Sequence, residues 1–583
     1  MSPIDRIMQG ALQAHQAGQL DAAVQGYRLA LSMLPDHPVI LNQCGVAELQ
    51  RGRMADAQQL FERSLSREPS QPEVLSNLAY VLNQLGDHAR AVEVCDRSLA
   101  LRRPNPDALT NQGEALRALG RPEEALARFE AALAARPDRA EYLYNRANAL
   151  LDLHRLDDAI RDFRSALERA PAVRQIRINL AAAHIRNHQV TAAIELLEEA
   201  RRMDEHDPLV WMNLGAAYDT QRRSSQAVAC FRRVIELGPD DALGHANLAQ
   251  VLDGTGQHAE AIHHYTQALW LNPALQECIG GRLMARRHIN DLTDHETETA
   301  WLQQSLDQGG PAVTPFHAIA LLDDPQAVTT AICRHVRQHM ALAASDGAPV
   351  SAGDASTSGK IRVGYFSADF GEHPVTHLLL PVLQRHDRQQ IEVHAFLTHP
   401  QPPSAALEGV QSAVDRFHDV TGQSVTDIQR LAQSAGIHIA VDLGGHTLNN
   451  RPELFAARVA PVQVSYLGFP GPSGMPAMDY LLADDALIPP PLRQHYPERV
   501  AYLDAYQAND FVSATPSTAG APQRADHGLP AAAFVFCCFS NSYKFSPATL
   551  GMWVRILKAT PSSVLWLYAD NAHSRANLAG HFK

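Results

Sequence analysis

The first half of the chain repeats a pattern every 34 residues. Alanine recurs at this spacing, and a bulky or apolar residue stands four positions after each alanine. The alanines are Ala23, Ala57, Ala91, Ala125, Ala159, Ala193, Ala227 and Ala261. The residues four positions later are Tyr27, Phe61, Cys95, Phe129, Phe163, Leu197, Phe231 and Tyr265. Proline stands twelve positions after six of the alanines, at 35, 69, 137, 171, 239 and 273.

A 34-residue period with these marks is the signature of tetratricopeptide repeats. Each unit is a helical hairpin whose helices cross closely, so a small residue sits at the crossing and a large one fills the space beside it. Proline ends the second helix because it cannot continue the backbone hydrogen bonds. We therefore predict an α superhelix of eight repeats over residues 4–275. A helical cap and linker region follows over 276–345.

Asparagine also recurs every 34 residues, in the first helix of each unit. The members are Asn77, Asn111, Asn145, Asn179, Asn213 and Asn247. Asparagine donates and accepts hydrogen bonds, so this ladder predicts binding of an extended acceptor peptide through its backbone. The alternative is that the amides bond neighbouring repeats.

The second half of the chain has a different pattern. Residues 346–359 are small and polar and predict a flexible linker. Over 360–520 strands alternate with helices, which indicates a parallel sheet covered on both faces, a Rossmann-like half. Residues 530–583 begin a second such half. Ligands in these sheets bind beyond the carboxyl ends of the strands.

Four sequence features in this region are candidates for chemistry. His373 follows the first strand, and His438 opens a later one. A glycine-rich loop carries Leu467 and Gly468, where backbone amides can approach a sugar or phosphate. Lys544 precedes a predicted helix and is well placed to hold a diphosphate. For each histidine and for the lysine, the alternative is a purely structural role.

Composition excludes several functional classes. The net charge is −13, and no run of Lys or Arg forms a basic face, so we expect no nucleic-acid partner. The sequence has no signal pattern and no apolar stretch long enough for a membrane span, so we expect a cytoplasmic protein. Its seven cysteines lack the spacing of a zinc site.

Several phrases together carry a family resemblance. They are Asp-Phe-Gly-Glu-His-Pro from Asp369, Asp-Leu-Gly-Gly-His-Thr from Asp442, Tyr-Leu-Gly-Phe-Pro-Gly-Pro-Ser-Gly from Tyr466, and Phe-Ser-Asn-Ser-Tyr-Lys from Phe539. Following tetratricopeptide repeats, they resemble the O-GlcNAc transferase and SPINDLY family, glycosyltransferases of the GT41 type. The resemblance implies a GT-B fold of two Rossmann-like halves. It also implies inverting transfer of GlcNAc from UDP-GlcNAc to Ser or Thr of acceptor proteins, with no metal and no other cofactor.

The resemblance also implies roles for individual residues. His373 and His438 match active-site histidines, and Lys544 matches a residue that stabilises the leaving diphosphate. The residues that match donor-binding positions are Leu467, Gly468, Asn541, Tyr543 and Lys544. Asp-x-Asp is absent from the predicted strand ends, which agrees with metal-free chemistry.

The sequence departs from the family pattern at its end. Only residues 534–583 belong to the nucleotide-binding half, and a His-Thr-Thr-Gly phrase of the family is absent. We therefore expect a truncated chain that is itself a poor transferase. Two alternatives remain open: a catalytically dead peptide-binding scaffold, and an O-fucosyltransferase of the SPINDLY type.

Overall fold

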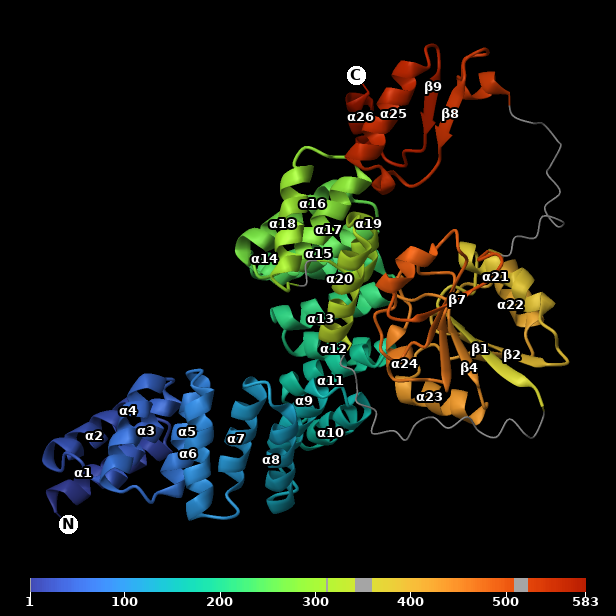
Figure 1. Cartoon of the computed structure of the whole chain (residues 1–583). Helices are drawn as coiled ribbons and strands as arrows, with labels where there is room; N and C mark the ends of the chain where they lie inside the picture. Colours follow the sequence, from blue (N-terminus) through green and yellow to red (C-terminus); the bar gives the residue numbers. More distant parts are fainter. Residues whose placement is uncertain (1, 311–312, 341–358, 508–522, 583) are drawn as a thin grey trace. The chain divides into compact units, whose positions relative to one another are not determined.

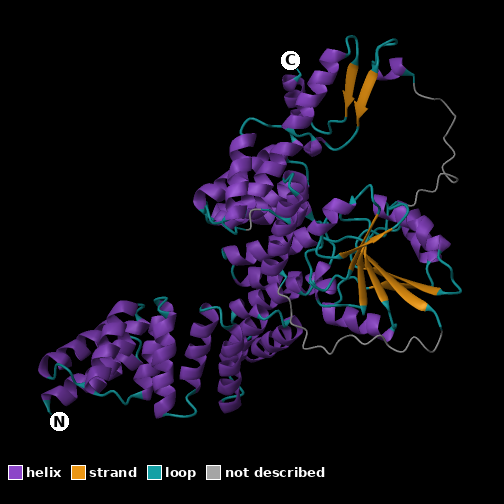
Figure 2. Ribbon diagram, viewed as in Figure 1, coloured by secondary structure: helices purple, strands orange, loops and turns teal. Residues whose placement is uncertain are grey.

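The computed structural model describes residues 2–310, 313–340, 359–507 and 523–582. The chain divides into two compact units, Met1–Arg186 and Asn187–Lys583, which are described separately below. Helices dominate the first unit, and the second unit holds both parallel sheets (Figures 1 and 2). The predicted linker at 346–359 lies almost wholly outside the described residues. Among the described residues, no helix is both long and apolar enough to cross a membrane.

The first unit consists of antiparallel helix pairs. Its helices are α1 (Pro3–Gln16), α2 (Leu20–Met33), α3 (Pro38–Gln50), α4 (Met54–Arg67), α5 (Pro72–Gln84), α6 (His88–Leu101), α7 (Pro106–Ala118), α8 (Pro122–Ala135), α9 (Ala140–Asp152), α10 (Leu156–Arg169) and α11 (Arg174–Arg186). Every repeat alanine of the chain is fully buried, and its large neighbour four residues on is buried too. A Cβ added at Gly113 would meet the Phe129 ring at 2.6 Å, so the helices touch as closely as the sequence predicted.

Repeat helices continue into the second unit. They are α12 (Val190–Met203), α13 (Pro208–Thr220), α14 (Ser224–Leu237), α15 (Ala242–Gly254) and α16 (His258–Leu271). The cap comprises α17 (Glu277–His288), α18 (His295–Asp307), α19 (Pro315–Leu321) and α20 (Pro325–His339). Gly281 of α17 lies against the Tyr265 ring, where a Cβ would stand 2.6 Å away. Helix α17 therefore packs on α16 as a further repeat helix would.

A seven-stranded parallel sheet follows, in the order β3-β2-β1-β4-β5-β6-β7. Its strands are β1 (Ile361–Ser367), β2 (Ile391–Leu397), β3 (Arg416–Asp419), β4 (Ile439–Asp442), β5 (Val462–Ser465), β6 (Tyr480–Ala483) and β7 (Arg499–Tyr502). The helices between them are α21 (Pro374–Arg385), α22 (Ala405–Ala413), α23 (Val425–Ser434), α24 (Pro452–Ala456) and the 3-10 turn η1 (Pro490–His495). The chain reverses direction across the sheet between β1 and β4, which is the switch point where such sheets bind ligands.

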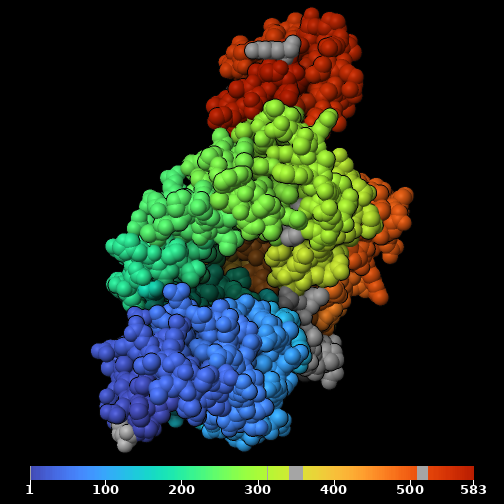
Figure 3. Space-filling model, turned by 90° about the vertical axis from the view of Figure 1, so that its left-hand side faces the viewer, coloured from blue at the N-terminus to red at the C-terminus, as the bar shows by residue number. Residues whose placement is uncertain are grey.

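The last described residues form a small separate layer. Strands β8 (Val535–Cys538) and β9 (Val564–Leu567) pair in parallel. Around them lie η2 (Arg524–His527), η3 (Ser542–Lys544), α25 (Pro547–Ala559) and α26 (Ala572–His581). Phe545, Leu550 and Leu578 form its core together with Leu292 from the cap. In Figure 3 this segment, drawn in red, lies directly on the green helices. The predicted fold class, tetratricopeptide helices followed by a GT-B-type α/β region, is confirmed.

The turn inside each helical hairpin has a left-handed backbone. The turn residues are 34 apart and all have positive φ: Gly18, Gly52, Gly86, Gly120, His154, His188, Arg222, Gly256 and Asn290. Glycine adopts this conformation without strain, whereas a residue with a Cβ loses about 1–2 kcal/mol. The positions without glycine therefore need a separate explanation.

Candidate active site

The carboxyl ends of β1, β4 and β5 bring three sequence motifs together. The first follows β1, where the Asp369 carbonyl accepts a hydrogen bond from the Thr376 hydroxyl and so fixes the loop to α21. The Asp369 side chain is nearly buried. Burial raises the pKa of this carboxyl, and the charge of nearby Arg222 acts in the opposite direction.

His373 ends this loop and caps α21. Its Nδ1 accepts the Val375 backbone N–H at 3.3 Å, which satisfies one of the free donors at the helix start. The Asp369 carboxylate is 3.9 Å from the same Nδ1. The ring is 45% exposed, so Nε2 is left for a partner outside the helix. His373 thus lies where the sequence predicted, at the carboxyl edge of the sheet.

The loop after β4 is organised around a buried carboxylate. Asp442 Oδ1 accepts the backbone N–H groups of Gly444 and Gly445 and the Asn450 side-chain amide, at 2.9–3.0 Å. The second oxygen, Oδ2, is buried without a hydrogen-bond partner. Burial raises the pKa of Asp442, while the three donors act in the opposite direction. This carboxyl holds the loop in shape.

His446 follows the two glycines and points back to the β5 loop. Its Nε2 lies 2.6 Å from the Ser473 carbonyl oxygen, which can only accept, so Nε2 carries the proton and Nδ1 the lone pair. Its ring packs edge-on to Phe469 at 5.2 Å. Burial lowers the pKa of His446, so the imidazole is neutral at neutral pH and Nδ1 can accept a proton.

The glycine-rich loop after β5 approaches the β4 loop very closely. A Cβ added at Gly468 would lie 1.9 Å from the Leu443 carbonyl oxygen, so no larger residue fits there. Leu467, which carries a side chain, has a φ of 74°. Such strain costs on the order of 1–3 kcal/mol and is concentrated at functional sites. Leu467 and Gly468 therefore lie at the same edge as His373 and His446.

His438 lies at the opposite edge of the sheet. It directly precedes β4, and its Nδ1 accepts the Arg362 backbone N–H at 2.9 Å near the start of β1. Because ligands of parallel sheets bind at the carboxyl ends, this position argues against the catalytic role predicted for His438. Its hydrogen bond instead joins the beginnings of two strands.

Asn541, Tyr543 and Lys544 lie in or beside η3, on the cap helices. The Tyr543 ring is 4.9 Å from His288 and 6.3 Å from Phe316, and Lys544 Nζ stands 5.9 Å from the Tyr543 ring centroid. In the part of the chain that the structure describes, no contact joins Lys544 to His373 or to the Leu467 loop. The structure thus does not assemble these candidates into one site.

The end of α17 holds this segment through its free carbonyl groups. The last carbonyls of a helix have no partner within it. The His288 carbonyl accepts from Ser542 Oγ at 2.9 Å and Asn571 Nδ2 at 3.1 Å, and the Ile289 carbonyl accepts from Asn577 Nδ2 at 2.8 Å. The residues that carry η3 are therefore fixed to the cap.

The asparagine ladder bonds mainly between repeats. In the first unit Asn111 donates to the Ser76 carbonyl at 2.8 Å, Asn145 to Glu114 at 2.8 Å, and Asn179 to the Tyr144 hydroxyl at 2.9 Å. In the second unit Asn247 donates to Met212 Sδ, whereas Asn213 bonds the Leu209 carbonyl of its own helix. These contacts favour the alternative that the amides join neighbouring repeats.

Two ladder members nevertheless line a hollow in the first unit. Its volume is about 310 Å³. The lining residues are Asn83, Gln84, His88, Glu114, Arg117, Tyr144, Asn145, Asn148 and Asn179. Burial raises the pKa of Glu114, and the hydrogen bond from Asn145 opposes that rise. An amide held by one N–H to the next repeat can still offer its oxygen to a ligand in this hollow.

Three further residues of this edge, Asp369, Asp442 and His446, were not among the candidates predicted from the sequence. All three lie at or just beyond the carboxyl end of a strand, the same criterion that selected His373. His446 meets this criterion, whereas His438 precedes its strand.

The family model described as "Glycosyl transferase family 41" matches residues 305–514 and 506–582. Tetratricopeptide models match segments between residues 14 and 275. The two glycosyl transferase matches cover the cap helices α19 and α20, the sheet and the β8-β9 segment.

Curated relatives match parts of the chain. A probable UDP-N-acetylglucosamine–peptide N-acetylglucosaminyltransferase SEC from Arabidopsis thaliana is 35% identical over 269 residues, covering 44% of this chain and 27% of the relative. A probable transferase of the same description named SPINDLY, also from Arabidopsis thaliana, is 30% identical over 208 residues, covering 35% and 22%. The chain thus spans less than a third of the length of these relatives.

Among solved structures, a lysine-to-methionine mutant of Thermobaculum terrenum O-GlcNAc transferase is similar at 26% identity and a TM-score of 0.47. The match covers 70% of this chain and 72% of that one.

Proposed function

Since the chain is a glycosyl transferase family 41 member with tetratricopeptide repeats, we propose that it transfers GlcNAc from UDP-GlcNAc to Ser or Thr hydroxyls of proteins. The observation that carries the proposal is that one family model covers the residues of the carboxyl edge and also those of η3. The edge combines an exposed histidine, a neutral half-buried histidine and a loop that only glycine allows to approach so closely, which suits a sugar held between backbone and imidazole groups.

The proposed reaction is a single displacement with inversion. The acceptor hydroxyl oxygen forms a bond to the anomeric carbon as the bond from that carbon to the diphosphate oxygen breaks. UDP leaves with the bonding electron pair, and the hydroxyl proton passes to a base. We assign no metal and no further cofactor to this step.

Two histidines are suited to different parts of this reaction. His446 Nδ1 carries a lone pair because Nε2 donates to Ser473, so it is able to accept a proton. His373 Nδ1 is engaged by the Val375 N–H, which leaves its exposed Nε2 to orient the acceptor or the sugar. Leu467 and Gly468 would contact the sugar through their backbone.

Lys544, with Asn541 and Tyr543 beside it, would bind the diphosphate. An ammonium group at the departing phosphate stabilises charge that grows in the transition state. This role requires η3 to face the carboxyl edge, so it depends on how the β8-β9 segment is placed during the reaction.

The repeats would bind the acceptor as extended peptide. The hollow beside Asn145 and Asn179 has amide groups able to pair with a peptide backbone irrespective of its side chains. In this proposal the partners are acceptor proteins and a nucleotide sugar.

A donor panel on the full chain tests the proposal. The chain is incubated with UDP-GlcNAc or GDP-fucose and an acceptor polypeptide, and mass spectrometry locates any added sugar. N-acetylhexosamine on Ser or Thr is the expected result, at the low yield expected of a poor transferase. Fucose in its place would support the SPINDLY-type alternative, and peptide binding without transfer from either donor would support the scaffold alternative.

Two matched variants test the site itself. His373→Ala is expected to lower transfer strongly. His438→Asn, at the opposite edge, keeps an acceptor for the Arg362 N–H and is expected to retain near-normal transfer. Equal loss in both variants would contradict the assignment of the site to the carboxyl edge.

A further inference from the structure

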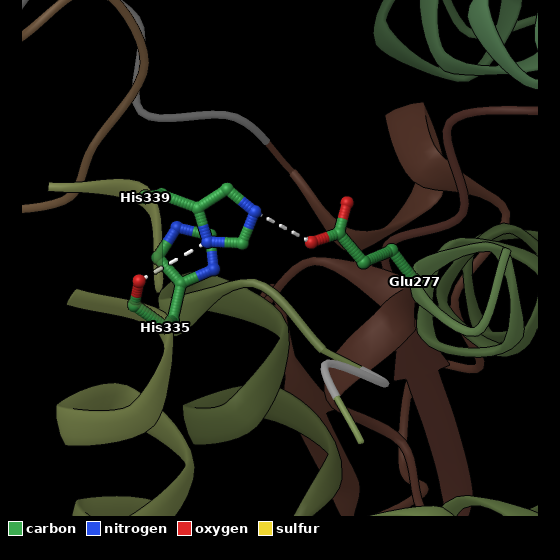
Figure 4. A group of neighbouring side chains, drawn as sticks. All are labelled: Glu277, His335 and His339. Carbon is green, nitrogen blue, oxygen red and sulfur yellow. Dashed lines mark hydrogen bonds and ion pairs between the residues drawn. The ribbon is translucent and has the colours of Figure 1, made fainter. Parts of the chain in front are cut away.

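Three side chains with metal-binding groups meet where the cap helices α17 and α20 adjoin. Glu277 is the first residue of α17, and His335 and His339 lie one turn apart near the end of α20. Residues four apart share a helix face, so both rings turn toward Glu277. One potential ligand atom from each residue lies within 4.8 Å of the other two (Figure 4).

The hydrogen bonds of His339 leave its second nitrogen facing a carboxylate. Nδ1 is 3.1 Å from the His335 carbonyl oxygen, which can only accept, so Nδ1 carries the proton. Nε2 lies 3.0 Å from Glu277 Oε1. In a neutral imidazole two lone pairs would then face each other, which is repulsive. A positive charge is needed between these atoms, either a proton on Nε2 or a bound cation.

His335 lacks a partner for a buried nitrogen. Its Nδ1 is buried and makes no hydrogen bond, and its ring stacks on His339 with centroids 4.2 Å apart. Leaving a buried polar atom unsatisfied is costly, and a lone pair in this setting is available to a metal. His335 therefore offers a second imidazole nitrogen to a cation, which a simple His339–Glu277 ion pair would leave without a partner.

We propose that Glu277, His335 and His339 bind one divalent transition-metal ion, with Zn²⁺ the best match. Two imidazoles and one carboxylate are a ligand set that Zn²⁺ takes, with water in the fourth position. Zinc bonds of about 2.0–2.1 Å place ligand atoms about 3.3 Å apart, so small side-chain rotations close the site. The His339 Nδ1 bond to a backbone carbonyl is the outer contact typical of histidine ligands.

The ion would fasten the end of the repeat array to the sheet. Helix α20 packs on the β5 loop, where a Cβ at Gly474 would meet Ile332 at 3.0 Å and the Cys333 backbone at 3.2 Å. Thr329 also donates to the His495 carbonyl at 2.6 Å. Linking α17 to α20 therefore restrains the helix that supports the catalytic loops. The ion takes no part in the sugar transfer.

The test is titration of the chelator-treated full chain with Zn²⁺ by calorimetry, together with thermal unfolding. We expect one ion per chain and a raised unfolding temperature. Glu277→Gln and His339→Gln are each expected to weaken binding by at least about tenfold, since even outer-shell changes cost 10–100-fold. His263→Gln, an exposed histidine on α16, is the matched control and is expected to bind as the wild type does.

Co²⁺ as a second probe excludes binding at the cysteine pair 537–538. Coordination by nitrogen and oxygen lacks the intense thiolate charge-transfer band in the ultraviolet, so that band should be absent. If the histidine variants fail to fold, the Zn²⁺ affinity of Glu277→Gln alone decides the test. Residue 277 is exposed, so its substitution is expected to leave the fold intact. Absence of Zn²⁺ binding, or equal affinity in the wild type and Glu277→Gln, would overturn the proposal in favour of a simple imidazolium–carboxylate pair.

Discussion

Replacing Asn290 by glycine is expected to loosen the β8-β9 segment without straining the turn that contains it. Asn290 is fully buried and has a left-handed backbone. Its Nδ2 donates to the Ser542 carbonyl at 2.9 Å, and its Oδ1 accepts from Ser574 Oγ at 2.6 Å. Glycine adopts the same φ more easily, so any loss of stability must come from these two hydrogen bonds.

The expected magnitude follows from the burial of both partners. Ser542 is 2% exposed and Ser574 is 0% exposed, so their freed groups cannot turn to water in the closed state. Each unsatisfied buried group costs about 1–3 kcal/mol. Relief of the left-handed strain of asparagine returns only a few tenths of a kcal/mol, because asparagine tolerates this conformation. With two groups freed, the net cost to closing the segment is at least about 2 kcal/mol.

Hydrogen–deuterium exchange of peptides covering β8, β9 and α26 measures this opening. A loss of at least about 2 kcal/mol corresponds to exchange at least about 30-fold faster when exchange reports the opening equilibrium. Gly256→Asn is the matched control: it places asparagine in the equivalent turn of the preceding repeat, where a Cβ meets open space. It should leave the segment's exchange unchanged. Wild-type exchange of the segment in Asn290→Gly would refute the reasoning.

Further variants and conditions test the other assignments. Lys544→Met should lower turnover about 10²–10³-fold and weaken donor binding if it stabilises the diphosphate, whereas Lys558→Met should not. The triple change of Asn145, Asn179 and Asn213 to Ala should weaken peptide binding in fluorescence titrations. It should also lower the unfolding temperature, because two of these amides join repeats. Unchanged peptide affinity in a folded variant would show that the ladder does not bind the peptide. Denaturant unfolding at several pH values should show that the free energy of unfolding falls as the pH drops from 6.5 to 4. Burial lowers the pKa of several histidines to about 4 in the folded chain, whereas the unfolded chain protonates them near 6.5. A constant free energy of unfolding across that window would contradict this prediction. These histidines are His264, His317, His335 and His399.

The repeat array was predictable because its sequence pattern and its packing share one period. A buried alanine every 34 residues requires a close helix crossing, and Phe129 beside Gly113 shows that crossing directly. The parallel sheet was predictable from the alternation of strands and helices. The packing of η3 on α17 was not, because it depends on amides such as Asn571 and Asn577 meeting helix carbonyls nearly three hundred residues away.

Strand direction separates the two histidines that the sequence predicted for the site. His373 stands after a strand and lies at the ligand-binding edge, whereas His438 stands before a strand and lies at the other edge. In the sequence the two histidines look alike, because each stands next to a predicted strand. Only the direction of the chain through the sheet separates them, and it places His446 rather than His438 at the edge where His373 lies.

The left-handed turns carry information that the period alone does not. Where the hairpin turn faces open space the residue is glycine, as at Gly86 and Gly256. In the second unit, His188 bonds Glu453 at 2.8 Å, the Arg222 guanidinium lies against the Asn449 amide, and Asn290 holds the β8-β9 segment.

These side chains offset the strain of their backbones with contacts to the α/β part of the chain. For Glu453 the effect is visible in its acidity: burial would raise its pKa, but His188 and Arg451 outweigh burial and lower it to about 2. A glycine at 188 would relieve strain and also remove this partner. At positions 188, 222 and 290 a residue other than glycine therefore stands where the turn contacts the α/β region, whereas His154, in the first unit, instead meets the Arg186 guanidinium at 3.2 Å.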